Sequence, residues 1–216
     1  MTKIKLCGLS RPCDIEAANR LKPAYIGFVF APKSRRYVNT EKAAELKNLL
    51  HPSIKAVGVF VRENPETVAR LLRNGTIDIA QLHGSESEDC IKQLRLLTDR
   101  PLIKAFRIDT EQDVEAANIS SADYVLLDSG PGGTGTVFNW NLLCRINRPY
   151  FLAGGLNTDN VRSAIERLNP YAVDVSSGIE TDGYKDIKKM EEFVHAIMLS
   201  DDNCASKMKS TKMELH

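Results

Sequence analysis

The sequence of 216 residues has few of the features that mark secreted, membrane-bound or zinc-holding proteins. It contains five cysteines, an odd number, and no C-x-x-C pair, so neither a disulfide framework nor a zinc site is indicated. Its most apolar window, AYIGFVFA over residues 24–31, is too short to span a bilayer, and the first residues lack the apolar core of a signal peptide. We therefore expect a cytoplasmic protein with no membrane partner.

The sequence also lacks an excess of charge of one sign, because the formal net charge is only +1. The densest basic cluster, K-S-R-R at residues 33–36, is too short to form a nucleic-acid-binding stripe, so no nucleic acid partner is expected. No set of metal-ligating residues stands out, and we expect neither a metal nor another cofactor. Hydrophobic residues make up 43% and charged residues 26%, which is typical of a globular protein.

What the sequence does contain is a regular alternation of two patterns. Amphipathic stretches typical of helices separate short runs rich in Val, Ile, Leu and Phe, and several of these stretches begin at a capping residue, an acid or a proline. Asn64, Ser85 and Thr110 are the residues expected to begin the third, fourth and fifth of these stretches. The last helical stretch follows Tyr184, and the one at residues 139–144 is short. The eight strand-like runs are residues 4–7, 24–30, 54–60, 78–82, 102–106, 123–127, 150–153 and 171–175.

Alternating strands and helices imply parallel pairing, because a parallel neighbour is reached only through a long crossover. Eight such units predict an α/β protein with a single domain, a (β/α)8 TIM barrel over residues 1–200, followed by a polar, mobile tail at 201–216. A doubly wound open sheet is the alternative. It would normally carry a glycine-rich phosphate loop after the first strand, which C-G-L-S-R-P does not resemble.

In such a barrel, function belongs at the carboxyl ends of the strands. The first strand should turn Lys5 and Cys7 inward, and the lysine would favour the thiolate form of Cys7. Asp128 ends the sixth strand before a loop with four glycines, where a desolvated carboxylic acid could donate a proton. The plainer alternatives are a buried thiol that only packs and an aspartate that only opens a turn.

Anion sites are expected at the same end of the barrel. Glycine lets the backbone approach a ligand, and phosphate sites in barrels often follow strands seven and eight, here at AGGLN and SSGIE. Arg35 and Arg36, after the second strand, could hold a carboxylate, although a solvated basic loop is the commoner outcome. His83, after the fourth strand, could donate a hydrogen bond to a ligand.

Taken together, these segments resemble the phosphoribosylanthranilate isomerase family of tryptophan biosynthesis. The resemblance spans residues 3 to about 198 and leaves the tail out. It rests on KLCGL, GFVFAPKSRRYV, VGVFV, QLHG, LLDSGPGGTG with FNW after it, AGGLN followed by NVRSAI, and AVDVSSGIE.

The resemblance implies an Amadori rearrangement of N-(5-phosphoribosyl)anthranilate to 1-(2-carboxyphenylamino)-1-deoxyribulose 5-phosphate. It assigns the general base to Cys7, the general acid to Asp128 and the grip on the anthranilate carboxylate to Arg36, with Arg35 as the competing candidate. The remaining substrate-binding residues that we expect are His83, Gly154, Gly155, Ser177 and Gly178. The enzyme would be a monomer or homodimer acting on a small phosphorylated substrate.

Three rival interpretations are weaker. The sister isomerase of histidine biosynthesis would call for an aspartate where Cys7 stands, and for a half-barrel repeat. Indole-glycerol phosphate synthase would need catalytic lysines at strand ends and an N-terminal extension. A silent phosphate-binding module would need neither Cys7 nor Asp128.

Overall fold

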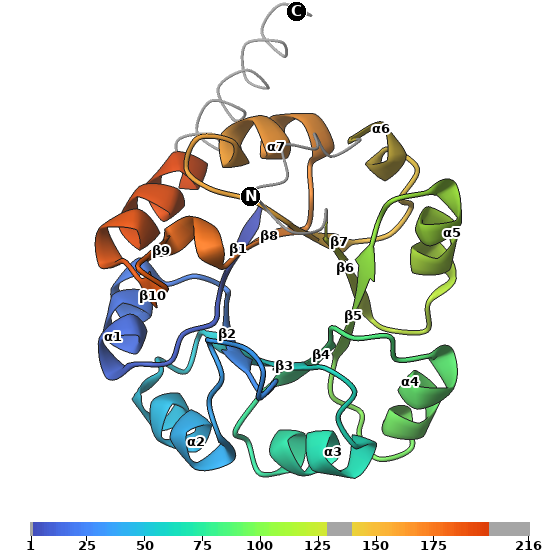
Figure 1. Ribbon diagram of the computed structural model, residues 1–216, viewed down its shortest axis with the longest axis horizontal. Coiled ribbons are helices and arrows are strands. Elements are labelled where there is room, and N and C mark those ends of the chain that lie inside the picture. The colour runs from blue at the N-terminus through green and yellow to red at the C-terminus, as the bar shows by residue number, and fades with distance from the viewer. Residues whose placement is uncertain (1, 129–139, 199–216) are drawn as a thin grey trace, which may run out of the picture.

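The computed structural model describes residues 2–128 and 140–198. Eight parallel strands form a closed barrel in chain order, and the last strand pairs with the first. Figure 1 looks down this barrel, with the strands as an inner ring and the helices outside it. The predicted (β/α)8 barrel is therefore confirmed, and the open doubly wound sheet is wrong because no strand of the ring is left at an edge. The strands are β1 (Lys3–Cys7), β2 (Tyr25–Val29), β3 (Lys55–Phe60), β4 (Ile79–Leu82), β5 (Leu102–Arg107), β6 (Tyr124–Asp128), β7 (Tyr150–Ala153) and β8 (Ala172–Val175).

The helices follow the strands at the predicted places. The short helix expected after the sixth strand is present as α6, and a last helix covers residues 187–198. The glycine loop at 129–139 and the tail at 201–216 lie outside the described residues, so the predictions made for them stay predictions. The named helices are α1 (Pro12–Leu21), α2 (Thr40–Leu49), α3 (Pro65–Arg73), α4 (Glu88–Arg95), α5 (Glu111–Ile119), α6 (Trp140–Leu143) and α7 (Val161–Leu168).

The helix starts show what the sequence pattern resolves and what it does not. Asn64 and Thr110 cap α3 and α5 as predicted, each accepting a backbone N–H with its side chain. For α4 the predicted cap Ser85 is wrong, because Ser87 caps the helix instead. The cap lies two residues later than predicted because the side chain of Glu86 turns inward and accepts a hydrogen bond from the buried Lys104. The loop therefore continues as far as Ser87 before the helix begins.

The interior of the barrel is filled by alternate residues of the strands. The amino-terminal half holds a cluster of apolar and aromatic side chains that includes Tyr25, Leu126 and Phe151. Ile4 and Leu6 lie outside the barrel in the core under the helices, whereas the other face of β1 points inward, as predicted. The cluster closes the lower half of the barrel, which leaves the carboxyl ends of the strands as the place for a ligand.

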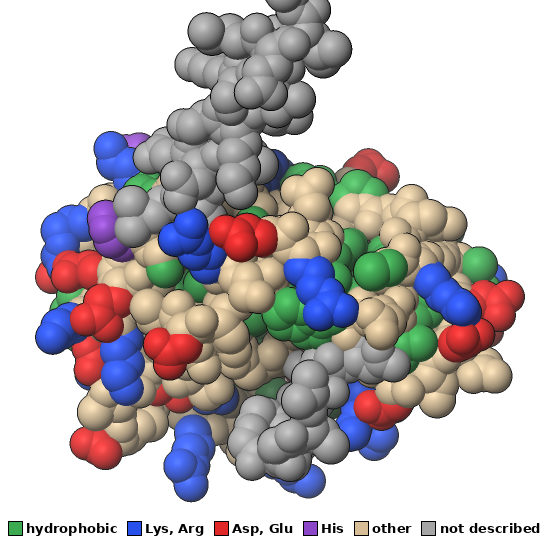
Figure 2. Space-filling view, turned by 90° about the horizontal axis from the view of Figure 1, so that it is seen from above, with side chains coloured by type: hydrophobic (Ala, Val, Ile, Leu, Met, Phe, Trp, Pro, Cys, Tyr) green, Lys and Arg blue, Asp and Glu red, His purple; other side chains and the backbone are tan. Residues whose placement is uncertain are grey.

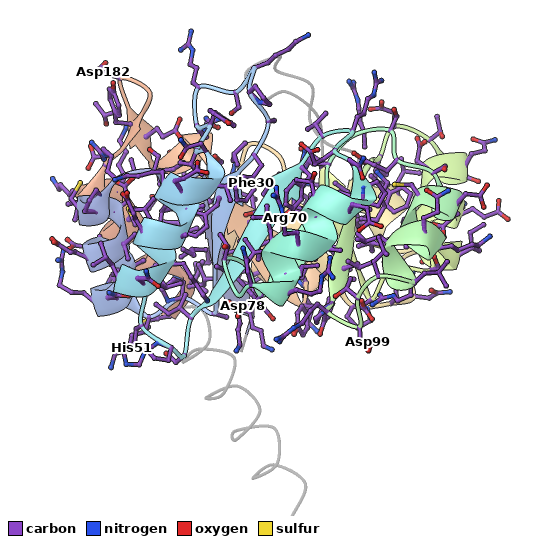
Figure 3. All side chains as sticks on the ribbon, turned by 90° about the horizontal axis from the view of Figure 1, so that it is seen from below. Phe30, His51, Arg70, Asp78, Asp99 and Asp182 are labelled. Atoms are coloured by element: carbon purple, nitrogen blue, oxygen red, sulfur yellow. The ribbon has the colours of Figure 1, made fainter. Side chains whose placement is uncertain are left out.

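An antiparallel hairpin that the sequence pattern missed lies between β8 and the last helix. It follows the 3-10 turn η1 (Ser177–Ile179) and consists of β9 (Glu180–Thr181) and β10 (Tyr184–Lys185). The last helix therefore begins at residue 187, two residues later than predicted. Figure 3 shows the barrel from the side, with Asp182 of the hairpin at one end and His51, Asp78 and Asp99 at the other. Since those three precede strands, the hairpin marks the carboxyl end.

Acidic and basic side chains alternate over the surface of the face drawn in Figure 2, without a large patch of one sign. This agrees with the small net charge of the sequence. Within residues 2–128 and 140–198, no helix is long and apolar enough to cross a membrane.

Candidate active site

A cavity of about 400 Å³ opens at the carboxyl ends of the strands. Its wall combines the ends of β1, β2, β3, β4, β6, β7 and β8 with the loop after β2. Gly178 is the predicted site residue that does not line this cavity. The predicted site residues that do line it are Cys7, Arg36, His83, Asp128, Gly154, Gly155 and Ser177.

Cys7 ends β1 and lies in the floor of the cavity, only 7% exposed. Its neighbour in register on β2 is Gly27, and a Cβ atom added there would lie 2.6 Å from the Cys7 Sγ atom. Glycine at position 27 is therefore what leaves room for the thiol. The backbone of the cysteine is held as well, because Ser176 Oγ donates to the Cys7 carbonyl over 3.1 Å.

Burial raises the pKa of the Cys7 thiol above its ordinary value, and Asp174 acts in the same direction, while Lys5 and Lys185 oppose both. The expectation that Lys5 favours the thiolate is right for the lysine alone. The pKa of the thiol is nevertheless raised, because the loss of solvation outweighs the attraction of the two ammonium groups in this site.

Lys5 lies beneath the thiol and is completely buried. Its ammonium donates to Asp174 Oδ1 on β8 over 2.9 Å, and Asp174 also lines the cavity. Burial lowers the pKa of Lys5, but Asp174 and Cys7 together raise it above its ordinary value. The ion pair thus keeps a charged lysine inside the barrel, directly below the proposed reaction centre.

Arg36 lines the cavity, whereas Arg35 beside it is exposed and does not. This geometry settles which of the two arginines faces the site. Arg36 is bound to Glu180 of the hairpin, donating from Nε over 2.6 Å and from Nη2 over 2.7 Å. Glu180 also accepts from the buried Lys185 over 2.5 Å, so one carboxylate joins two cations at this side of the cavity.

Asp128 and His83 meet across the cavity from β6 and from the end of β4. His83 Nε2 lies 3.5 Å from Asp128 Oδ2, and both side chains are about one-third exposed, at 34% and 29%. On its other side the imidazole contacts Gln81, whose Nε2 atom is 2.7 Å from His83 Nδ1. The predicted acid thus has an imidazole as a neighbour, at a distance at the outer limit of a hydrogen bond.

The ends of β7 and β8 provide the backbone that was predicted to hold phosphate. Gly154 and Gly155 have φ angles of 89° and 64°, in the left-handed region that glycine adopts without strain. Gly178 packs so closely that an added Cβ would lie 2.0 Å from the carbonyl oxygen of Leu156. Ser177 opens η1 beside these glycines, so two backbone turns converge on one side of the cavity.

Several polar residues of the site were missed in the sequence, among them Asp174, Gln81, Glu180 and Lys185. Asp174 and Gln81 could have been found, because each occupies an inward position of a strand near its carboxyl end. Glu180 and Lys185 could not, since they reach the site only through the unpredicted hairpin. No group of three or more potential metal ligands occurs in the parts of the chain that the structure describes.

Known proteins match this chain over nearly its whole length. A family model described as N-(5'phosphoribosyl)anthranilate (PRA) isomerase matches residues 4–196. The N-(5'-phosphoribosyl)anthranilate isomerase of Thermoanaerobacter sp. (strain X514) is 46% identical over 203 residues, which cover 91% of this chain and 98% of that protein.

Comparison with solved structures leads to the same family as the sequence matches. The phosphoribosyl anthranilate isomerase of Thermotoga maritima is 36% identical, with a TM-score of 0.82 and coverage of 91% and 98% of the two chains. A phosphoribosyl anthranilate isomerase in complex with reduced 1-(o-carboxyphenylamino)-1-deoxyribulose 5-phosphate is also 36% identical, with a TM-score of 0.78 over 90% of this chain and 97% of the other. The chain belongs to the N-(5'-phosphoribosyl)anthranilate isomerase family.

Proposed function

We propose that this isomerase converts N-(5-phosphoribosyl)anthranilate into 1-(2-carboxyphenylamino)-1-deoxyribulose 5-phosphate with Asp128 as general acid and Cys7 as general base. The observation that carries the proposal is that both side chains line one cavity, from the carboxyl ends of β6 and β1. An acid and a base on opposite walls suit a reaction that adds a proton at one substrate atom and removes one at another.

Binding would use the two ends of this cavity. Nε and one hydrogen of Nη2 of Arg36 serve Glu180, so Nη1 and the second hydrogen of Nη2 form the edge that the ion pair leaves for the substrate carboxylate. The fixed fork of a guanidinium suits a carboxylate. The phosphate would be held by backbone amides near Gly154, Gly155, Ser177 and Gly178, where closely packed glycine turns let an anion approach the chain.

The reaction would then begin with two proton transfers that involve side chains of the protein. Asp128 protonates the furanose ring oxygen as the bond from that oxygen to C1 breaks, and the nitrogen lone pair forms the C1–N double bond of a Schiff base. The Cys7 thiolate next removes the proton from C2, and those electrons form an enolamine. Tautomerisation moves a proton to C1 and leaves the C2 ketone.

The other families considered from the sequence fit less well. The sister isomerase was expected to carry an aspartate at the end of β1, and this chain has Cys7 there. A silent phosphate binder would have no use for a thiol and a carboxylate in the same cavity. We further propose that His83 contacts the substrate beside Asp128, and that the enzyme acts as a monomer or a homodimer.

The test follows the fluorescence of freshly prepared N-(5-phosphoribosyl)anthranilate, corrected for its spontaneous hydrolysis. We expect enzyme-dependent loss of signal in the wild type and a loss of at least about 100-fold in kcat for Cys7→Ser and Asp128→Asn, as for the removal of a general base or acid. Cys90→Ser, on α4 and outside the cavity, is the control. Unchanged turnover in the two site variants would overturn the acid and base assignment.

A further inference from the structure

Gln81 is a buried polar residue of the cavity to which the proposed mechanism gives no role. It projects from β4 into the barrel and lines the cavity, and it is only 1% exposed. Its neighbours in register on β3 and β5 are Val59 and Ile103, both buried and apolar. A carboxamide among such neighbours needs partners for both of its ends, because a buried polar atom without a hydrogen bond destabilises the fold.

The nitrogen end of the amide has its partner. Gln81 Nε2 lies 2.7 Å from Nδ1 of His83, and an amide nitrogen can only donate. Nδ1 of the imidazole must therefore accept, which puts the ring proton on Nε2. That nitrogen is the one that faces Asp128, 3.5 Å from Oδ2.

The backbone that carries His83 is fixed independently of Gln81. The His83 N–H donates to the carbonyl of Phe60 over 2.8 Å. Lys104 donates to the carbonyl of Gly84 over 2.7 Å and to Glu86 over 3.0 Å, and its side chain is 6% exposed. The contact from Gln81 to the imidazole is therefore not needed to hold the loop, but it does orient the ring.

The oxygen end of the amide has no partner within the described part of the chain. Among residues 2–128 and 140–198, Gln81 Oε1 is the buried side-chain nitrogen or oxygen atom that makes no hydrogen bond. A carbonyl oxygen can only accept. The group that completes it must therefore bring an N–H or O–H donor into the cavity.

We propose that Gln81 is a further substrate-binding residue of the isomerase, which orients His83 toward Asp128 with its amide nitrogen and accepts a hydrogen bond from a ribose hydroxyl with its amide oxygen. This inference rests on the proposed function, which brings a phosphorylated sugar into the cavity. The sugar is favoured over the anthranilate amine as the donor, because the single N–H of the amine is taken up by the carboxylate ortho to it on the same ring, whereas the ribose hydroxyls stay free to donate.

The test compares Gln81→Met with the wild type, using ribulose 5-phosphate and anthranilate as separate inhibitors. We expect inhibition by ribulose 5-phosphate to weaken by roughly tenfold, the effect of one lost hydrogen bond, and inhibition by anthranilate to stay unchanged. Gln93→Met, at an exposed position of α4, is the matched control and should alter neither. Weaker inhibition by anthranilate alone would overturn the assignment to a hydroxyl.

A melting curve separates binding from a structural role. Because the substitution removes an unpaired buried acceptor, Gln81→Met should melt no lower than the wild type, although its kcat/KM falls. Gln81→Glu keeps an acceptor for the sugar but loses the donor to His83. It should therefore lower kcat while retaining more of the inhibition by ribulose 5-phosphate than Gln81→Met does.

Failure of the proposed function can be distinguished from failure of the role proposed for Gln81. A wild type without turnover would reject the proposed function. A wild type that turns over the substrate, with a Gln81→Met variant of unchanged kcat/KM and unchanged inhibition, would reject the role of Gln81 alone. Equal loss of sugar phosphate inhibition in Gln81→Met and Gln81→Glu would also overturn it.

Discussion

Arg36 and Glu180, which are 144 positions apart in the chain, form a two-pronged ion pair at the edge of the cavity. The pair ties the loop after β2 to the β9–β10 hairpin. It raises the pKa of Arg36 through the hydrogen bonds to Glu180. Burial raises the pKa of Glu180, but the hydrogen bonds from Arg36 and Lys185 bring it below its ordinary value. The cation proposed to bind the substrate is therefore positioned before any substrate arrives.

The first prediction concerns this pair. Glu180→Gln leaves Lys185, whose side chain is 2% exposed, without its counter-charge, and breaking a buried pair in this way should cost about 3 kcal/mol of unfolding free energy. KM should rise because Arg36 is no longer oriented. Urea unfolding and steady-state kinetics measure the two effects.

The matched control for that experiment is Glu166→Gln. Glu166 pairs with Arg162 on the surface of α7, where both side chains are about half exposed, at 58% and 47%. An exposed pair of this kind contributes at most about 0.5 kcal/mol. Equal losses in the two variants would contradict the importance of the buried pair.

The second prediction concerns pH. Burial and Asp174 raise the pKa of Cys7, with Lys5, Lys185 and Arg36 as the charged groups around it. A base that works as a thiolate gains active form as the pH rises toward its pKa, so kcat/KM should increase on the alkaline side of neutrality. The absorbance of the thiolate near 240 nm, with Cys7→Ser as the blank, should rise over the same range. A rate that is flat above pH 7 would contradict a thiol as the base.

Most of the barrel could be predicted because its signals are local. Alternating apolar runs and amphipathic helices recur along the chain, and the direction of a strand residue follows from its parity, which is why Lys5, Cys7 and Asp128 were placed correctly. The same parity would have placed Asp174 and Gln81, since both occupy inward positions.

The rest depended on contacts between distant segments. The β9–β10 hairpin is too short to produce a pattern, and the pairing of Arg36 with Glu180 arises only once the barrel has closed. The direction of the Cys7 pKa shift could not be predicted for a related reason: the sequence shows the neighbouring lysine but not the extent of burial, which has the larger effect here.

The third prediction concerns the packing of Gly178. An added Cβ would lie 2.0 Å from the Leu156 carbonyl oxygen, which belongs to the backbone and cannot move aside cheaply. Gly178→Ala should therefore destabilise the protein by about 1–3 kcal/mol and weaken inhibition by inorganic phosphate, because the turns after β7 and β8 are forced apart. Thermal melting and inhibition assays measure both.

Gly75→Ala is the comparison for that variant. Gly75 has a φ of 78° but open space around its Cα, and it follows α3, outside the cavity. It should lose about 1 kcal/mol through backbone strain and leave phosphate inhibition unchanged. A Gly178→Ala variant with wild-type phosphate inhibition would remove the β7–β8 turns from the proposed phosphate site.

The last prediction tests the buried pair that supports His83. Lys104 and Glu86 are 3.0 Å apart, with side chains 6% and 3% exposed, and Glu86 also accepts from the backbone N–H groups of Arg62 and Gly84. Lys104→Met leaves the carboxylate without its cation and should cost about 3–5 kcal/mol. Adding Glu86→Gln should recover part of that loss, because a neutral amide accepts one of these hydrogen bonds through its oxygen and carries no unpaired charge.

The contribution of this pair to stability should depend on pH through the pKa of Glu86. Burial raises the pKa of Glu86, but the hydrogen bonds from the Arg62 N–H and from Lys104 bring it below its ordinary value. A carboxyl with a depressed pKa stabilises the fold above its unfolded pKa, and this contribution is lost as the pH falls. As the pH is lowered from 7 to 4, the free energy of unfolding in urea should therefore decrease less for Lys104→Met than for the wild type. Lys92→Met, whose side chain is 68% exposed, should follow the wild type, and a Lys104→Met curve parallel to both would show that the pair does not stabilise the loop through charge.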